Sequence, residues 1–284
     1  MLESKSHSTT LIVLLIILAV AIGCYLSKNA VLPRQVWQSA ARFMVGQETR
    51  LNTAQFQEMQ TEHFKIKYTQ ADSDYVSIIA ASAEQAYSQV SKQMGKTEQK
   101  ATTIVVYPDH QSLAKSFGWD KDEKALGVYW SGTIRILSPH EWLKQPYDQD
   151  EFRTDGPLVH EYVHLIVDDM TRGNYNRWWT EGVAQYIEKQ ITGFQFDHPS
   201  DVSQEQLYTL QELGKNFDQL DQQMAYWESR QAIAFIAHQY GEKQLYIIMD
   251  YLAQGETLSK AIEKATGTDF NSFASQCYQY MQKQ

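Results

Sequence analysis

The sequence predicts an α+β fold, in which a mixed sheet with helices is followed by a mostly helical C-terminal part. Strand-like segments, with alternating or continuous apolar residues, fall before about residue 140. From about residue 150 onward, apolar residues recur mainly at helical spacing. The chain also has only 14 glycines and 6 prolines among 284 residues, a share below average usage that favours helices.

Composition excludes several classes of protein. The net charge of −9 leaves no basic surplus to neutralise phosphates, so we expect no nucleic-acid partner. A hydrophobic content of 43% is enough for a sizeable core. The two cysteines, Cys24 and Cys277, allow neither a disulfide framework nor a cysteine-based zinc site.

The first element is an apolar N-terminal segment. Residues 11–26 carry no charge and no amide, and as a helix residues 9–27 would extend about 28 Å, close to the thickness of a hydrocarbon core. We therefore expect residues 1–27 to form one transmembrane anchor that meets the membrane through residues 9–27. Two alternatives stay open: a cleaved signal peptide, and a lipoprotein anchored at Cys24, which follows a weak lipobox.

The charges around this segment give a weak indication of its orientation. Lys5 is offset by Glu3 before the segment, whereas Lys28, Arg34 and Arg42 follow it. This arrangement favours a cytoplasmic domain, although long domains translocate largely regardless of such charges. We expect a single-pass protein of the cell membrane with its large folded domain outside the cytoplasm, and the cytoplasmic-facing domain is the alternative.

The rest of the chain divides into a connector and one folded unit. Residues 28–60 are polar, rich in glutamine and loosely helical, and we interpret them as a juxtamembrane connector. The folded unit is expected over residues 61–284, with an α/β part at 61–170 and a helical part at 171–284. The early elements of this unit are expected as strands at 63–68, 102–107, 127–130 and 133–137, and as helices at 72–94 and 110–117. Ser131-Gly132 between the last two strands is a hairpin signal.

A His-Glu-x-x-His motif, His160-Glu161-Tyr162-Val163-His164, opens the helical region. Residues four apart lie on one face of a helix, so both imidazoles can reach one metal ion. Glu161 is offset by about 100°, which suits a carboxylate that handles water beside the metal. The alternative is a pair of ordinary histidines on a polar helix face.

A catalytic zinc usually has a third protein ligand, and the candidate is Glu181. It lies 17 positions after His164 in the segment Trp178-Trp-Thr-Glu-Gly-Val-Ala-Gln-Tyr186. We expect Thr180 to cap a second helix and Glu181 to lie in its first turn, from where the carboxylate can reach the metal. The alternative is an ordinary acidic residue at a helix N-terminus, which the helix dipole favours.

Together, the two motifs resemble the gluzincin branch of zinc metallopeptidases and, more narrowly, the bacterial peptidase MA-like families. The resemblance covers about residues 60–284 and implies a zincin-like fold. It also implies one Zn²⁺ ion held by His160, His164 and Glu181, with Glu161 as the general base. Gln185 departs from the pattern, because thermolysin-like members have an aspartate at that position.

The resemblance has further implications for the site. Tyr226 is the candidate that stabilises an oxyanion, and the alternative is a packing tyrosine beside Trp227. Strand 133–137 is expected to be the sheet edge to which an extended peptide adds. Asp168 lies one turn past His164 and is a candidate to orient an imidazole; the alternative is a carboxylate that faces solvent.

Two functional hypotheses follow. The first is a membrane-anchored zinc peptidase that hydrolyses peptide or protein substrates with metal-activated water. The second is a catalytically silent zincin-like binding or scaffold module at the membrane. The presence of Glu161 together with the three expected ligands favours the first.

Overall fold

The expected membrane segment lies almost entirely outside the part of the chain that can be described. A computed structural model describes Ile17, Val20 and residues 31–98, 100–118, 125–144, 149–196 and 207–284. Cys24 and the remainder of residues 9–27 are not among them. Within the described part, no helix combines the length and the apolar character needed to cross a membrane.

Within the described residues, five strands form one mixed sheet in the order β1-β2-β3-β5-β4. The central strands β2, β3 and β5 are parallel, and β1 and β4 lie antiparallel at the two edges. The strands are β1 (Gln57–Gln60), β2 (Phe64–Tyr68), β3 (Thr102–Tyr107), β4 (Gly127–Trp130) and β5 (Thr133–Leu137). The predicted mixed sheet is therefore confirmed.

The expectation that Thr133–Leu137 forms the sheet edge is wrong. Ser131 and Gly132 both have positive φ, 42° and 90°, so the chain reverses in a tight two-residue turn. This turn lays β4 on the outer side of β5, which is then enclosed between β3 and β4. All five residues of β5 are buried, as expected of an interior strand, and β4 is the edge.

Residues 28–60, interpreted as a connector, contain helix α2 (Val31–Asn52) and strand β1. The loosely helical character predicted there is confirmed by α2. Strand β1 was not predicted, because its sequence Gln-Glu-Met-Gln has one apolar residue and no alternation. Its extended conformation depends on pairing with β2, which is a tertiary interaction.

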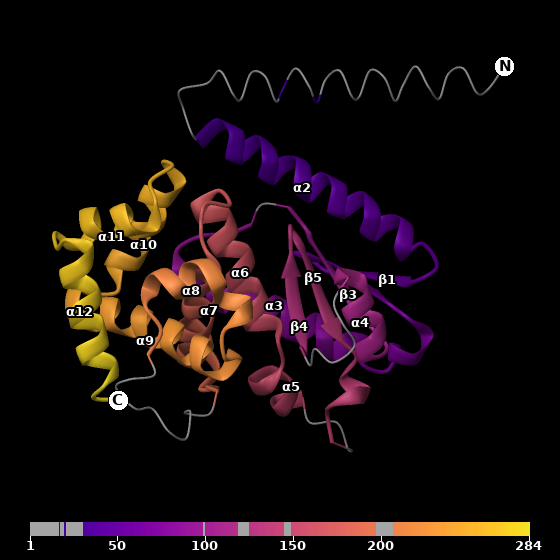
Figure 1. Cartoon of the computed structure of the whole chain (residues 1–284). Helices are drawn as coiled ribbons and strands as arrows, with labels where there is room; N and C mark the ends of the chain where they lie inside the picture. The colour runs from indigo at the N-terminus through magenta and orange to yellow at the C-terminus, as the bar shows by residue number, and fades with distance from the viewer. Residues whose placement is uncertain are drawn as a thin grey trace.

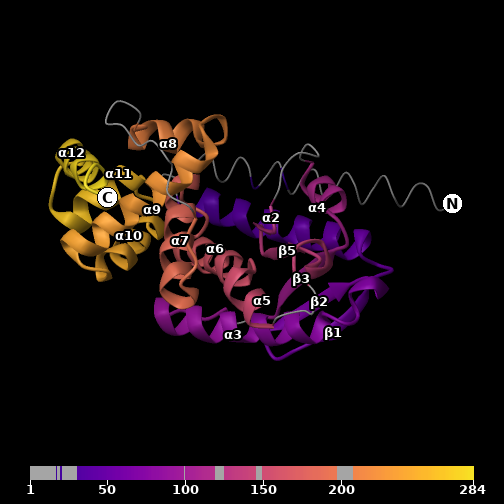
Figure 2. The ribbon, with the colours of Figure 1, turned by 90° about the horizontal axis from the view of Figure 1, so that it is seen from below.

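Helices surround the sheet. Helix α3 (Val76–Met94) and helix α4 (His110–Phe117) lie on opposite sides of it (Figure 2). Both helices were expected, and each ends at a glycine with positive φ, Gly95 and Gly118. Helix α5 (Gln149–Asp155) follows the hairpin and leads into the helical part of the chain.

The C-terminal half is helical, as the sequence predicts, and forms the side of the molecule away from the sheet (Figure 1). Its helices are α6 (Leu158–Thr171), α7 (Arg177–Thr192), α8 (Leu210–Asn216), α9 (Gln222–Tyr240), α10 (Lys243–Ala253), α11 (Leu258–Thr266) and α12 (Phe270–Met281). Helix α6 packs against α3, β4 and α7, so it joins the two halves.

Helices α7 and α9 approach each other closely at Gly182. A β-carbon at this position would lie 2.4 Å from the carbonyl oxygen of Ser229 and 2.7 Å from the side chain of Ile233. Only glycine fits there, because such contacts are far shorter than van der Waals distance. The close approach fixes the turn of α7 that carries the neighbouring Glu181.

Glu228 provides a test of the helical core. Its side chain is fully buried; one carboxylate oxygen accepts from the Tyr208 backbone N–H at 2.9 Å, and no hydrogen-bond partner lies within reach of the other among the described residues. Burial raises the pKa of Glu228 to about 8. The folded state therefore retains a proton that the unfolded state has lost, and this group makes stability fall as pH rises from about 4.5 to about 8.

We predict that Glu228→Gln flattens this dependence. We measure urea unfolding of the full chain between about pH 5 and pH 8. The free energy of unfolding should fall with pH less steeply in the variant than in the wild type, and the two slopes should differ by about 1 kcal/mol per pH unit. Glu62→Gln, at a side chain that is 83% exposed, serves as the control and should retain the wild-type slope. Parallel slopes for all three proteins would contradict the prediction.

Candidate metal centre

Helix α6 carries the His-Glu-x-x-His motif on a firmly buried scaffold. Leu165, Ile166 and Val167 are each at most 1% exposed, so most of the helix surface is fixed in the core. His160 and His164 project from the remaining face, one turn apart, toward helix α7. The predicted common face of the two imidazoles is therefore present.

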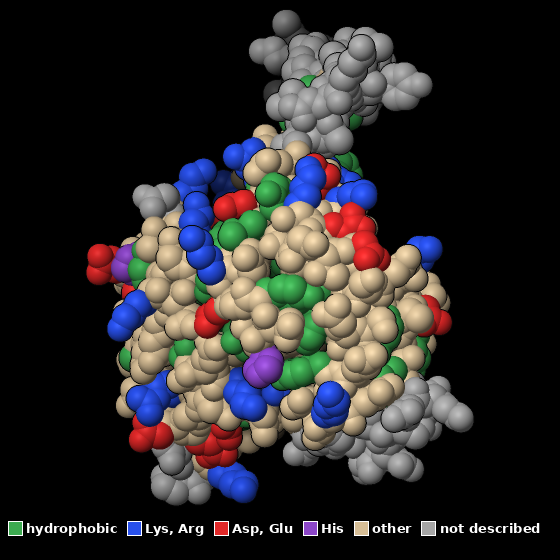
Figure 3. Space-filling view, turned by 90° about the vertical axis from the view of Figure 1, so that its left-hand side faces the viewer, with side chains coloured by type: hydrophobic (Ala, Val, Ile, Leu, Met, Phe, Trp, Pro, Cys, Tyr) green, Lys and Arg blue, Asp and Glu red, His purple; other side chains and the backbone are tan. Residues whose placement is uncertain are grey.

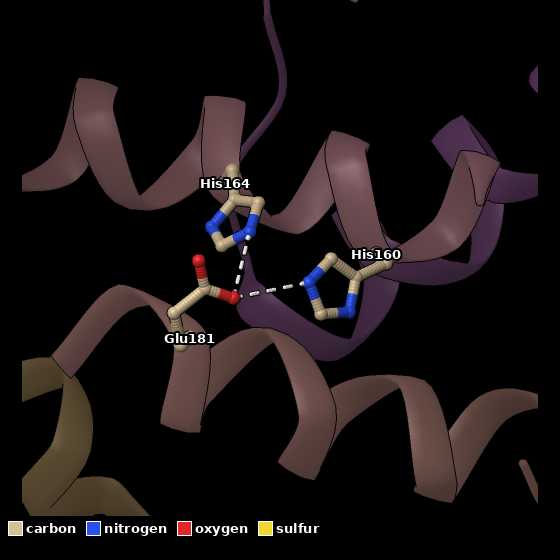
Figure 4. A group of neighbouring side chains, drawn as sticks. All are labelled: His160, His164 and Glu181. Carbon is tan, nitrogen blue, oxygen red and sulfur yellow. Dashed lines mark ion pairs between the residues drawn. The ribbon is translucent and has the colours of Figure 1, made fainter. Parts of the chain in front are cut away.

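Glu181 of α7 meets both histidines from the opposite side (Figure 4). Its Oε2 lies 3.4 Å from Nε2 of His160 and 3.5 Å from Nε2 of His164. One ligand atom from each residue lies within 4.8 Å of the other two. In the described part of the chain, this is the one group of at least three such side chains that could hold a metal ion.

A separate observation indicates that these three side chains could bind a metal ion. Glu181 Oε2 is buried, and among the described residues it has no hydrogen-bond partner. The two nitrogen–oxygen distances exceed those of an ordinary hydrogen bond, and an unsatisfied buried acceptor costs free energy. A cation between the three atoms would satisfy all of them, and two histidines with one glutamate is a known set of ligands for catalytic zinc.

The other ring nitrogens are already engaged. Nδ1 of His160 lies 3.0 Å from Oε2 of Glu188, and Nδ1 of His164 lies 2.7 Å from Oγ1 of Thr180. Such contacts set the tautomer and orientation of a metal-binding histidine, leaving Nε2 free to bind. The amide of Gln185 instead donates to the backbone carbonyl of Tyr226.

Sequence reasoning missed both orienting residues. The signal for Glu188 was its position seven residues after Glu181, which is two turns along the same face of α7. Thr180 was expected to cap the helix, but α7 begins at Arg177 after the N-cap position Asn176, so Thr180 lies within the helix and Glu181 in its second turn. The helix starts earlier because the buried Trp178 and Trp179 belong to it.

Burial and charge shift the pKa values of the site in opposite directions. Burial disfavours the imidazolium of His160, but the carboxylates of Glu188 and Glu181 outweigh it and raise its pKa well above the ordinary value. Burial likewise opposes ionisation of Glu181, but the imidazoles of His164 and His160 hold its pKa well below the ordinary range. Burial raises the pKa of Glu161.

Glu161 lies between the histidines and the edge strand. It is 5% exposed, and the backbone of Tyr129 in β4 forms a hydrogen bond with its carboxylate. A β-carbon on Gly127 of β4 would lie 3.0 Å from Cγ of Glu161 and 2.6 Å from Cβ of Pro157. Glycine therefore allows the edge strand to lie directly against the start of α6.

Tyr226 of α9 also reaches the site. Its hydroxyl donates to Oε1 of Glu181 at 3.3 Å, and Arg177 Nε lies 3.4 Å from the same oxygen. These two groups engage Oε1 and leave Oε2 facing the histidines. Trp227 is 2% exposed and packs in the core, and Tyr226 packs against the same core, with its ring centroid 5.4 Å from that of Phe217.

The expectation that Asp168 orients an imidazole is wrong, and so is its solvent-facing alternative. Asp168 is buried, and its Oδ2 accepts hydrogen bonds from the Tyr129 hydroxyl at 2.6 Å and from Arg42 Nε at 3.1 Å. The imidazole that it was expected to orient, His164, has Thr180 as its partner. Asp168 instead links α6 with α2 and β4, a contact that spacing along one helix does not reveal.

Three comparisons relate this chain to known proteins. A family model described as the Peptidase MA superfamily matches residues 82–283. A search of curated proteins gave no significant match. Among solved structures, a mutant of the M1 zinc metallopeptidase from Deinococcus radiodurans aligns with 78% of this chain and 50% of its own, at 11% identity and a TM-score of 0.41. The chain thus spans about half the length of that structure.

We predict that Glu188→Gln weakens binding of Zn²⁺ by about 10–100-fold at pH 8, because His160 loses its orienting carboxylate. This loss of affinity should be smaller at pH 6. Glu188 also raises the pKa of His160, so in the wild type more protons compete with the metal at low pH than in the variant. Competition with a chromophoric chelator measures both affinities.

Lys189→Gln, which removes an exposed charge one residue further along α7, is the matched control and should bind Zn²⁺ as the wild type does. Unaltered affinity in Glu188→Gln at both pH values would show that this carboxylate does not support the site.

Proposed function

The chain belongs to the Peptidase MA superfamily, and from this premise we propose that it is a zinc-dependent peptidase of the gluzincin type. The observation that carries the proposal is the convergence of Nε2 of His160, Nε2 of His164 and Oε2 of Glu181 around one point. Two histidines from one helix and a glutamate from the next would hold a single zinc ion. When bound, zinc would act as a Lewis acid that polarises the scissile carbonyl and acidifies water.

Glu161 is proposed as the general base. It interacts electrostatically with both imidazoles, and it is not in the group of three side chains whose ligand atoms converge, so we assign its carboxylate to water rather than to the metal. It would accept a proton from the attacking water and deliver it to the leaving amine nitrogen. Its raised pKa suits both steps, because burial brings the proton affinity of the carboxylate closer to neutral pH, where it has to take up and release the same proton.

Tyr226 is proposed to stabilise the developing oxyanion. Its hydroxyl already lies beside the glutamate ligand, 3.3 Å from Oε1 of Glu181. Burial raises the pKa of Tyr226 above its ordinary value, so the hydroxyl stays protonated and can donate a hydrogen bond. Its one proton is donated to Oε1 of Glu181 in this structure, and it would turn to the oxyanion as negative charge develops there, while Arg177 remains beside Oε1.

The proposed substrate is a peptide or protein segment in extended conformation. Strand β4 is the sheet edge nearest the site, and its outer side has no strand partner among the described residues. An extended peptide can add to such an edge through backbone hydrogen bonds. Because Tyr129 of β4 contacts Glu161, a peptide on this edge would bring its backbone beside the general base.

We further propose that residues 9–27 anchor the protein in the cell membrane with its catalytic domain outside the cytoplasm. The support is the uncharged sequence of residues 11–26. Anchoring through a lipid at Cys24 and a cytoplasmic-facing domain are the alternatives. Protease treatment of intact cells separates the orientations, because only an extracytoplasmic domain is digested.

We predict that Glu161→Gln retains about one zinc per chain but loses peptidase activity by at least about 10²-fold, because the proton acceptor is gone. Metal analysis and a broad peptide library measure the two properties on the same full-length preparation. Glu62→Gln, at an exposed glutamate, is the control and should keep both.

A metal-free wild type would overturn the proposal. A zinc-loaded wild type that neither cleaves peptides nor is captured by a hydroxamate probe would favour the silent scaffold instead.

We predict that Tyr226→Phe lowers kcat by about 10–10³-fold while changing KM and zinc content little, because the lost hydroxyl acts on the transition state. Steady-state kinetics on one cleaved peptide give both constants. An unchanged kcat would assign Tyr226 a packing role.

A further inference from the structure

Helix α2 presents an apolar face to the outside. Five large apolar side chains on it are between 42% and 69% exposed. They are Val36, Trp37, Phe43, Met44 and Leu51, and we call them the α2 stripe. At 3.6 residues per turn they fall within an arc of about 120° and extend for about 22 Å along the helix.

The opposite face of α2 docks on the fold largely through polar contacts. Gln38 donates to the backbone carbonyl of Asp168 at 2.9 Å, and Arg42 binds the carboxylate of the same residue. Beside the stripe rather than opposite it, Glu48 pairs with Arg135 of β5 at 3.6 Å. A surface helix of a water-soluble protein has the reverse pattern, with its apolar face inward.

The apolar surface continues beyond α2. Trp130, at the tip of the β4–β5 hairpin, is 41% exposed, and it lines the same hollow of about 490 Å³ as Trp37. Figure 1 shows α2 lying along the outside of the fold, where its outer face is not covered by another described element. The face formed by the C-terminal helices differs, because charged side chains of both signs are interspersed on it (Figure 3).

The position of α2 in the chain indicates what covers the stripe. The uncharged stretch ends at Leu26, and four residues separate it from Val31, where α2 begins. Four intervening residues can span at most about 18 Å. If the stretch is held in a bilayer, as proposed above, α2 cannot lie far from the surface of that bilayer.

We propose that the α2 stripe lies in the interfacial region of a lipid bilayer, with α2 parallel to the membrane plane. An apolar helix face inserts about 5–10 Å at the boundary of headgroups and acyl chains, and tryptophan is favoured at that depth. Arg50, exposed near the C-terminal end of the stripe, would meet lipid phosphates. This inference rests on the membrane attachment proposed above, and it is independent of zinc and peptidase activity.

Photocrosslinking tests the inference. The full chain, with p-benzoylphenylalanine in place of Phe43, is reconstituted in vesicles of phosphatidylethanolamine and phosphatidylglycerol, irradiated and analysed by mass spectrometry. The control carries the same probe in place of Gln279, an exposed residue of α12. We expect phospholipid adducts at position 43 to exceed those at position 279 by about tenfold.

The outcomes are distinguishable. Chain-to-chain adducts at position 43 would assign the stripe to a second copy and overturn the inference, as would equal lipid capture at both positions or no adduct at all. Alkaline carbonate extraction of the same vesicles reports attachment separately. A chain that resists extraction without capturing lipid would overturn only the placement of α2, whereas a chain that is extracted would overturn attachment as well. Zinc content and peptidase activity of the same preparation test the proposed function independently.

Discussion

The convergence of one carboxylate oxygen and two imidazole nitrogens is the constraint on which the rest of this structure depends. Glu181 Oε2 is buried without a hydrogen-bond partner among the described residues, so its position has to be held by the surrounding fold. Two features hold it there. The close approach of α7 to α9 at Gly182 fixes the turn that carries the carboxylate, and the buried face of α6 fixes the two histidines.

The neighbouring side chains isolate these three atoms by engaging the other polar atoms of the same residues. Glu188 and Thr180 contact the Nδ1 atoms of the histidines, while Tyr226 and Arg177 contact Oε1 of the glutamate. What is left facing the centre is one nitrogen from each histidine and one oxygen from the glutamate. These pairings connect α6, α7 and α9, and they determine which atoms of the three residues face the centre.

The sequence predicts this protein well where local signals suffice. The strands at 102–107, 127–130 and 133–137 and the helix at 110–117 have the expected bounds, because alternation, glycine and hairpin chemistry act over a few residues. The motif helices bring His160, His164 and Glu181 together as expected. Strand β1, the edge position of β4 and the partners of Asp168 were beyond prediction, because each depends on contacts between segments far apart in the chain. Glu188 had a helical-spacing signal but needed knowledge of which face of α7 turns toward α6.

The hydrogen bonds of Asp168 have a thermodynamic consequence. Through Arg42 and Tyr129, this carboxylate joins the outer helix α2, the edge strand β4 and the end of the helix that bears the histidines. Three elements that share one buried acceptor cannot shift independently without breaking a bond to it. A change in the tilt of α2 that also displaces β4 would therefore change the affinity of β4 for the proposed peptide substrate. By reciprocity, a peptide bound to β4 would change the affinity of α2 for the proposed bilayer surface by the same factor.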